Sequence, residues 1–480
     1  MASEKSLLKS EDWMALWIGL LIFLLTITQL AGIDLLGWAA KLNVWNDLSK
    51  AVTPVSKGFA GVSPLVSVLL TYLFLMVIMG VGAKLLGYNV GKFASSFTLI
   101  FIISYLSLLI GHYASIAATP NQLKAFNLTW SLNLTGEAGF IIALLAGLLV
   151  GNFFTKFGGI LEEGTRPEWF IKTAIVIMGA SLGVKAVDAL SLASAVLFRG
   201  LCAIIEAYLI YWAVVYYVAR KWFGFSREWS APLASGISIC GVSASIATGG
   251  AIRARPIVPI MVSSLVVIFA VVEMLILPFL AQTFLFKEPM VAGAWMGLAV
   301  KTDGGAIASG AIVDALIRAK AMAVDGVNYK DGWILMTATT VKIFIDVFIG
   351  VWAFILAFIW CTVIEARPGE KMRAGEIWDR FPKFVIGYVV TFLLLLILCS
   401  TNAGLLGPSK AAVAEADTFR QLFFAMTFFT IGAVSNFKKL WEEGIGKLAA
   451  IYVLCLFGFI IWVGLIISWI FFHGVKPPLA

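Results

Sequence analysis

Apolar runs of about twenty residues recur along the whole chain, and this pattern constrains the fold more than any other feature of the sequence. A helix of that length crosses the hydrocarbon core of a bilayer, and the chain holds about thirteen such runs. Inside lipid the backbone must satisfy its own hydrogen bonds, which a helix does within one segment. The sequence therefore predicts an all-α polytopic membrane protein with about 13 transmembrane helices.

Composition supports this class and argues against a soluble domain. Of the 480 residues 61% are hydrophobic and 13% are charged, with a mean hydropathy of +0.97, whereas soluble domains carry about 25% charged residues. The two longest polar stretches, 32–63 and 362–380, are too short to bury a core of their own. The cysteines lie in or beside apolar runs without paired spacing, so we interpret them as reduced packing residues. They are Cys202, Cys240, Cys361, Cys399 and Cys455.

The predicted spans divide the chain into three parts. Residues 1–93 hold two extra spans, a candidate scaffold or dimerisation element, residues 94–472 hold the transporter core, and residues 473–480 form a short tail. The spans lie near 13–31, 64–86, 94–116, 138–155, 168–185, 193–218, 232–251, 256–286, 290–313, 333–361, 381–400, 418–436 and 447–472.

Positive charge favours one orientation in the membrane. The loops KLLGYNVGK, ARKWFGFSRE and RPGEKMRAGEIWDRFPK share the side of the N-terminus and hold more Lys and Arg than the opposite loops. Because Lys and Arg collect on the cytoplasmic side, we expect a multi-pass protein of the cytoplasmic (inner) membrane with a cytoplasmic N-terminus. An odd number of spans then places the C-terminus outside. If 232–251 or 290–313 is re-entrant, the side of the C-terminus changes.

The segment 297–310, GLAVKTDGGAIASG, sets Lys301, Thr302 and Asp303 before the pair Gly304-Gly305 inside a run apolar enough to cross a bilayer. A charge at the bilayer centre costs about 2.5–3.5 kcal/mol on insertion scales, and such residues usually meet an ion, a proton or a substrate. Adjacent glycines weaken the helix, and unwound backbone at membrane depth is tolerated where it lines a cavity. We therefore expect a broken helix with a binding site at this point.

A second segment, 232–251, is dense in small hydroxyl residues and glycines. One interpretation is close helix packing, which small residues permit. The other is an anion cradle at a half-helix N-terminus, where the helix dipole and freed N–H groups favour negative charge. Its members would be Ser238, Cys240, Gly241 and Ser243.

Two further spans carry paired charges. Arg199 and Glu206 lie seven apart, two helical turns along one face, and Lys342 and Asp346 lie four apart, close enough to touch. Both could be structural ion pairs that lower the cost of burial. Alternatively, one member titrates or changes partner as substrate binds.

Internal symmetry is faint. Residues 175–184, IVIMGASLGV, and 428–437, FFTIGAVSNF, share an apolar run followed by a Gly-Ala pair. An odd number of predicted spans separates them, so they would run in opposite directions, as an inverted repeat requires. Gly-Ala after apolar residues is also common in any membrane helix.

These motifs carry a family resemblance. The stretch 235–248, SGISICGVSASIAT, resembles the GSSICGAAAVLAT signature of the YeiH-type sulfate exporter family, also known as a family of conserved hypothetical membrane proteins. AGFIIALLAGLLVGN at 138–152, IKTAIVIMGASLGV at 171–184 and FFAMTFFTIGAVSNFKKL at 423–440 follow in the matching order. The resemblance covers roughly residues 94–472 and is most specific at SICG.

The resemblance implies a secondary transporter similar in fold to the bile acid, arsenite and bicarbonate carriers, with inverted repeats and broken helices. Where that family carries a Val-His-Glu element, this chain has Val300-Lys301-Thr302 followed by Asp303. The change alters charge and titration range, so the substrate expectation stays broad: sulfate, a sulfonate or a small carboxylate.

The expected roles follow from charge and donor chemistry. Lys301 would supply positive charge to the anion, and Asp303 would bind the coupling ion, Na⁺ or a proton. Hydrogen bonds would come from the rest of the predicted site, which comprises Ser238, Cys240, Gly241, Ser243, Thr302, Gly304 and Gly305. The extra N-terminal spans favour assembly as a homodimer.

Other function classes have weaker support. The chain holds only His112 and His473, with no HExxH, GxSG or GxxxxGK[ST] motif, so we expect neither an enzyme nor an ATP-driven pump. No cofactor, metal site or nucleic-acid partner is predicted. A channel would share the architecture without alternating access, and a membrane sensor or anchor would need a signalling module from a partner subunit.

Overall fold

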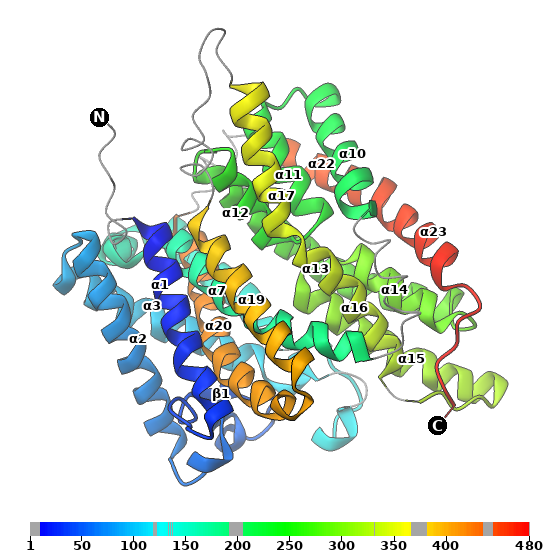
Figure 1. Ribbon diagram of the computed structural model, residues 1–480, viewed down its shortest axis with the longest axis horizontal. Helices are drawn as coiled ribbons and strands as arrows, with labels where there is room; N and C mark the ends of the chain where they lie inside the picture. Colours follow the sequence, from blue (N-terminus) through cyan, green and yellow to red (C-terminus); the bar gives the residue numbers. More distant parts are fainter. Residues whose placement is uncertain are drawn as a thin grey trace. The chain divides into compact units, whose positions relative to one another are not determined.

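The computed structural model describes residues 10–118, 122–132, 134, 136, 138–191, 205–330, 332–365, 382–434 and 445–479 (Figure 1). Within these ranges the chain is mostly helical with almost no sheet, which confirms the predicted all-α class. The short strands β1 (Ala40–Leu42) and β2 (Val52–Pro54) pair antiparallel, with Lys41 opposite Thr53.

The predicted number of spans is not confirmed. In the described ranges eight helical segments are long and apolar enough to cross a bilayer, or nine if Ala138–Phe153 and the bent helix after it form one span. The predicted spans that lie in these ranges are mainly helical, but 232–251 and 290–313 contain non-helical breaks at 239–240 and 300–302. The difference in number arises chiefly because several of these helices are interrupted or carry polar turns.

The chain forms two compact units. Unit 1 comprises Met1–Ala117, Gly136–Val187 and Lys383–Lys439, and unit 2 comprises Ala118–Thr135, Asp188–Pro382 and Leu440–Ala480. Each unit is assembled from distant parts of the sequence. The predicted boundary at residue 93 is a different kind of division, because it separates the two extra N-terminal spans from the predicted transporter core. It stays a prediction.

Unit 1 is a bundle of long helices with the β1–β2 hairpin beside it. The principal helices are α1 (Glu11–Ile27), α2 (Pro64–Leu86), α3 (Val90–Gly111), α5 (Ala138–Phe153), α7 (Pro167–Ser191), α19 (Lys383–Thr401) and α20 (Leu406–Val434), with the short helices α4 (Ala114–Ala117) and α6 (Thr155–Leu161).

Local sequence signals set where the first helices of unit 1 begin. The Ser10 hydroxyl accepts the Trp13 N–H at 3.3 Å before α1, and Asn89 accepts the Lys92 N–H at 3.1 Å before α3. Ser63 caps α2, whose first residue is Pro64. Side-chain caps satisfy N–H groups that have no partner within the helix, and proline suits the first helical position.

Glycine pairs spaced four apart let the helices of unit 1 pack closely. Gly147 and Gly151 of α5 lie against backbone carbonyls of α20, and Gly179 and Gly183 of α7 lie against those of α19. A side chain at any of these positions would meet the neighbouring backbone. Such small-residue contacts are the usual means of close helix association in membranes.

Charged and polar side chains join one end of the unit 1 bundle. Lys172 of α7 lies 3.0 Å from Glu168 and 3.5 Å from Asp12 of α1. The Tyr88 hydroxyl, in the α2–α3 turn, donates to Glu11 at 2.6 Å. Partial burial and this hydrogen bond raise the pKa of Tyr88 above its ordinary value. The end of the bundle that holds the start of α1 is therefore a polar cluster.

Unit 2 contains the interrupted helices. Its elements are η7 (Ile205–Tyr211), α10 (Trp212–Tyr217), η8 (Val218–Trp222), α11 (Arg227–Ser238), α12 (Gly241–Ala251), α13 (Ile257–Phe284), α14 (Pro289–Ala299), α15 (Asp303–Asp325), α16 (Trp333–Val347), α17 (Ile349–Ile359), η9 (Trp360–Ile364), α22 (Ile445–Cys455), η11 (Leu456–Ile460) and α23 (Ile461–Phe472).

The segment 232–251 is a helical hairpin, here called hairpin A, formed by α11 and α12. The helix stops at Ser238, and the chain resumes as α12 at Gly241 after the tip residues Ile239 and Cys240. The Thr248 hydroxyl donates to the Ser235 hydroxyl at 2.6 Å, so the two helices run back along each other. Hydroxyl and glycine residues thus serve packing between the halves as well as the tip.

The segment 290–313 lies in a second helical hairpin, hairpin B, formed by α14 and α15 around the tip Val300–Thr302. Helix α14 packs parallel to the first part of α16. Helix α15 packs on the same part of α16 but runs in the opposite direction. The contacts are those of Gly293 with Ile334, Gly297 with Ala338, Gly310 with Ala338, and Asp314 with the Ile334 N–H at 3.0 Å. The break falls just before Asp303, and the glycine pair belongs to the first turn of α15.

The two hairpins and the helices that follow them form an inverted pair. In each case the second half-helix runs antiparallel to the next long helix, α12 to α13 and α15 to α16. Gly305 lies against Met274, and Lys320 donates to the Gln282 carbonyl at 3.0 Å, so α13 and α15 run in the same direction. Hairpin A with α13 therefore points opposite to hairpin B with α16, which is an inverted arrangement.

Replacing Gly297 should destabilise unit 2. In Gly297→Ala the added Cβ would lie 2.5 Å from the Ala338 carbonyl oxygen, and overpacking of this kind typically costs about 1–3 kcal/mol. The thermal unfolding midpoint of the purified protein measures the effect. Gly80→Ala is the matched control, because that α2 glycine faces open space. An equal midpoint for Gly297→Ala and the wild type would contradict the packing described.

Candidate functional site at the hairpin tips

The tips of the two hairpins meet inside unit 2. The Gly241 N–H, the first of α12, donates to the Lys301 carbonyl in the other tip at 2.7 Å. Gly241 has no room for a side chain, because an added Cβ would overlap Val266 of α13. This glycine is what allows α12 to lie close to α13 while its N–H reaches the other tip.

Lys342 of α16 holds the tip of hairpin A. Its ammonium donates to the Ile239 carbonyl at 2.8 Å and lies 3.6 Å from Asp346. Both side chains are buried, with exposed fractions of 2% and 1%. The lysine thus neutralises the negative end of α11, while the carboxylate compensates its charge.

Glu273 of α13 holds the tip of hairpin B. Its Oε2 accepts the Lys301 N–H at 3.2 Å, and the side chain is fully buried. The arrangement is reciprocal: the long helix after hairpin B ties the tip of hairpin A, and the long helix after hairpin A ties the tip of hairpin B.

The Lys301 side chain lies within the protein rather than in open space. Its ammonium donates to the Leu298 carbonyl at the end of α14 and lies 4.8 Å from the centre of the Tyr211 ring. The Tyr211 hydroxyl donates to Glu206 and to the Ile460 carbonyl. With an exposed fraction of 1%, Lys301 is one of the largest fully buried side chains in the described ranges.

Hydroxyl groups surround the starts of the second half-helices. Thr302 caps α15 by accepting the Gly305 N–H at 3.2 Å. Cys240 precedes α12 without a side-chain cap, although the first N–H groups of a helix lack intrahelical partners. Ser238 and Ser243 are both buried beside this uncapped start, and the Ser238 hydroxyl has no hydrogen-bond partner among the described residues.

Most predicted site residues come together here. The hydroxyl segment and the segment around Lys301 meet tip to tip, and the spacing-based pair Lys342–Asp346 is in contact. Glu206 lies near Lys301, but Arg199, its predicted partner, lies outside the described residues, as does Cys202. Asp303 and Gly304 begin α15, and the structure describes only their backbone.

Glu273 is the principal site residue that the sequence prediction missed. It is a lone carboxylate in the apolar helix 257–284. An intramembrane ionisable residue is a candidate functional residue by default, so its signal was present. No oppositely charged residue three or four positions away marks Glu273 in the sequence. Its partner is the Lys301 backbone, which lies in hairpin B.

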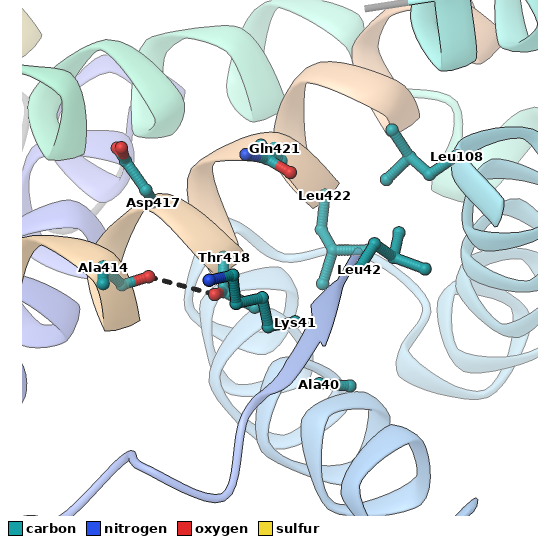
Figure 2. Close-up of a pocket in the computed structure, with 9 residues that line it drawn as sticks. All are labelled: Ala40, Lys41, Leu42, Leu108, Ala414, Asp417, Thr418, Gln421 and Leu422. Carbon is teal, nitrogen blue, oxygen red and sulfur yellow. Dashed lines mark hydrogen bonds between the residues drawn. The ribbon is translucent and has the colours of Figure 1, made fainter. Parts of the chain in front are cut away.

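A separate cavity of about 230 Å³ lies in unit 1, beside strand β1. Figure 2 shows Lys41, Asp417 and Gln421 among the side chains around it, with the Thr418 hydroxyl donating to the Ala414 carbonyl at 3.0 Å. No residue of the predicted site lines this cavity. The buried charges and paired half-helix ends therefore make the hairpin tips the stronger candidate.

The apolar helices and the paired hairpins define a polytopic helical membrane protein. The chain belongs to the family described as Conserved hypothetical protein 698, whose model matches residues 95–451. This confirms the resemblance to the YeiH-type family that the SICG motif indicates.

Relatives extend over most of the chain. The UPF0324 membrane protein NE0724 of Nitrosomonas europaea is 41% identical over 475 residues, 98% of this chain and 97% of the relative. A UPF0324 membrane protein of Nitratidesulfovibrio vulgaris is 27% identical over 427 residues, 85% of this chain and 65% of the relative. No solved structure matches. The family match begins at residue 95, whereas the Nitrosomonas alignment also takes in most of the two extra spans.

Glu273 should contribute strongly to stability through its contact with hairpin B. Glu273→Leu removes the acceptor of the Lys301 N–H and leaves buried cations with less compensation, which typically costs about 3–5 kcal/mol. Glu273→Gln keeps an acceptor oxygen, so its unfolding midpoint should lie between those of Glu273→Leu and the wild type. Glu228→Gln, in an exposed pair with Arg255 at 3.0 Å, is the control and should cost about 0–1 kcal/mol. A Leu variant as stable as the wild type would refute this role.

Proposed function

We propose that the protein is a secondary active transporter that carries a small anion across the cytoplasmic membrane by alternating access. The observation that carries the proposal is the hydrogen bond between the two hairpin tips, Gly241 N–H to Lys301 carbonyl at 2.7 Å, in an inverted pair of helical hairpins. Broken helices that meet at the interface of inverted repeats form the substrate and coupling-ion sites of many transporters. Membership of a membrane-protein family supports the same class.

The uncapped start of α12 supports an anionic substrate. The N–H groups of its first turn beyond Gly241 offer hydrogen-bond donors, and so does the fully buried Ser238 hydroxyl, which has no partner among the described residues. The helix dipole adds positive potential. Lys342 and Lys301 also lie at the two tips, but Asp346 and Glu273 balance their charge, so the hydrogen-bond donors and the helix dipole carry the preference for an anion. Sulfate, a sulfonate or a small carboxylate fits this donor set, with Ser243 and Thr302 as further donors.

A coupling cation is the second part of the proposal. Asp303, at the first position of α15, is the residue to which the sequence assigns Na⁺ or a proton. A channel of the same architecture, or a membrane sensor or anchor, is the alternative. Flux that saturates at low substrate and responds to a counter-ion gradient separates a carrier from a channel.

Anion binding should depend on Ser238. A ligand that binds only the folded state raises its stability by about 2.7 kcal/mol at a hundredfold excess over its Kd, so the purified protein is heated with sulfate, sulfite, sulfonates, small carboxylates or bicarbonate. Ser238→Ala should bind the effective anion about tenfold or more weakly, because a hydrogen bond to a charged group contributes about 1.5–3 kcal/mol. Ser67→Ala in unit 1, another buried serine without a hydroxyl partner, is the matched control. No shift with any anion would exclude the anionic substrate.

Transport should require the charges of hairpin B. In proteoliposomes loaded with the anion identified by binding, Lys301→Ala and Asp303→Ala should each lower the initial uptake rate at least about tenfold, since intramembrane charges at such sites are functional. Protein content and orientation in the vesicles are matched by surface labelling. If both variants transport and bind as the wild type does, the proposed site is wrong.

A further inference from the structure

Two buried lysines of unit 2 each donate to a carbonyl at the C-terminal end of a first half-helix, Lys342 from the neighbouring helix α16 and Lys301 from the tip of hairpin B itself. Lys342 donates to the carbonyl of Ile239, the first residue after α11, and Lys301 donates to the carbonyl of Leu298, near the end of α14. In both hairpins a lysine ammonium group thus contacts the C-terminal end of the first half-helix. The C-terminal end of a helix carries partial negative charge and unpaired carbonyls, which favour a cation.

A coupling sodium ion would need the same oxygen atoms. Unwound carbonyls and the C-terminal ends of half-helices are the groups that bind Na⁺ in transporters with discontinuous helices. Here a side chain of the protein already bonds one such carbonyl in each tip. Hydroxyl oxygens such as Ser238 are neutral, and each carboxylate described near the tips interacts electrostatically with a lysine.

The carboxylates do not restore a sodium site. Glu206 Oε2 and Glu273 Oε1 accept no hydrogen bond from the part of the chain that the structure describes, but both groups interact electrostatically with Lys301, and Glu273 also with Lys342. Asp346 lies 3.6 Å from the Lys342 ammonium. A sodium ion at any of these oxygens would be repelled by an ammonium group that shares the same low-dielectric region.

We propose that Lys301 and Lys342 are built-in counter-cations of the two half-helix ends, so that this site works without bound Na⁺. The inference deepens the proposed transport function and narrows its coupling ion. The first test of this inference measures the effect of ions on stability, so its result does not depend on whether the protein transports an anion.

The direct test compares thermal unfolding of the full-length protein in sodium chloride and in choline chloride at equal ionic strength. The wild type should have the same midpoint in both salts. Lys342→Ala should unfold at a lower temperature and regain several degrees in sodium chloride only, because the vacated space borders the Ile239 carbonyl and the Asp346 carboxylate. Lys342→Met fills that space without charge and should lose stability in both salts alike.

Two controls isolate the cation site. Lys342→Ala combined with Asp346→Asn lacks the carboxylate and should show no recovery with sodium. Lys320→Ala removes a lysine that donates to another helix-end carbonyl, Gln282, at 3.0 Å, but that position lies away from the tips and should give no difference between salts.

Sodium-dependent stabilisation of the wild type would overturn the proposal, and so would a folded Lys342→Ala that does not respond to sodium. If Lys342→Ala does not fold, binding of radioactive ²²Na⁺ to the wild type decides, since saturable binding contradicts the proposal and its absence supports it. Uptake of the anion in choline medium should equal that in sodium medium. A protein that binds no anion yet passes the sodium tests would refute the proposed anionic substrate and leave the role of the lysines intact.

Discussion

The hydrogen bond from the Gly241 N–H to the Lys301 carbonyl is the contact on which the arrangement of unit 2 depends. It joins two places where helices are interrupted and backbone groups are released from helical bonding. In a low-dielectric interior such groups are costly unless they are paired. The tip of hairpin A supplies an N–H donor and the tip of hairpin B supplies a carbonyl acceptor. Two helix interruptions that would each be unfavourable alone therefore stabilise one another.

Charge burial follows from the same geometry. The half-helix ends at the tips place partial charges in the interior, and Lys342 and Lys301 compensate the negative ends. Glu273 and Asp346 then compensate the lysines. Removing one partner of such a group costs more than the pair contributes. Because a buried ion pair adds little net stability, the charged cluster supports the proposed binding site at the tips.

The sequence predicted the helical class and an interruption in each of the segments 232–251 and 290–313, because apolar length and a local density of polar and glycine residues are signals within one segment. The second break lies at 300–302, before the glycine pair. The sequence also predicted the Lys342–Asp346 pair, since a spacing of four on a helix is a local signal. It did not predict that 232–251 and 290–313 reverse direction, although re-entry was an alternative, because the contact of Thr248 with Ser235 depends on tertiary packing. Glu273 was missed for the same reason: its partner belongs to a hairpin distant in sequence.

A density map of the full-length protein in lipid nanodiscs, determined by electron cryo-microscopy, would test the central claim most directly. We predict that the chain reverses at 239–240 and at 300–302, that the two tips touch through Gly241 and Lys301, and that the lysine ammonium groups lie on the Ile239 and Leu298 carbonyls. A continuous helix through either segment would contradict the account. So would tips too far apart for a hydrogen bond in every resolved state, with both lysines directed elsewhere.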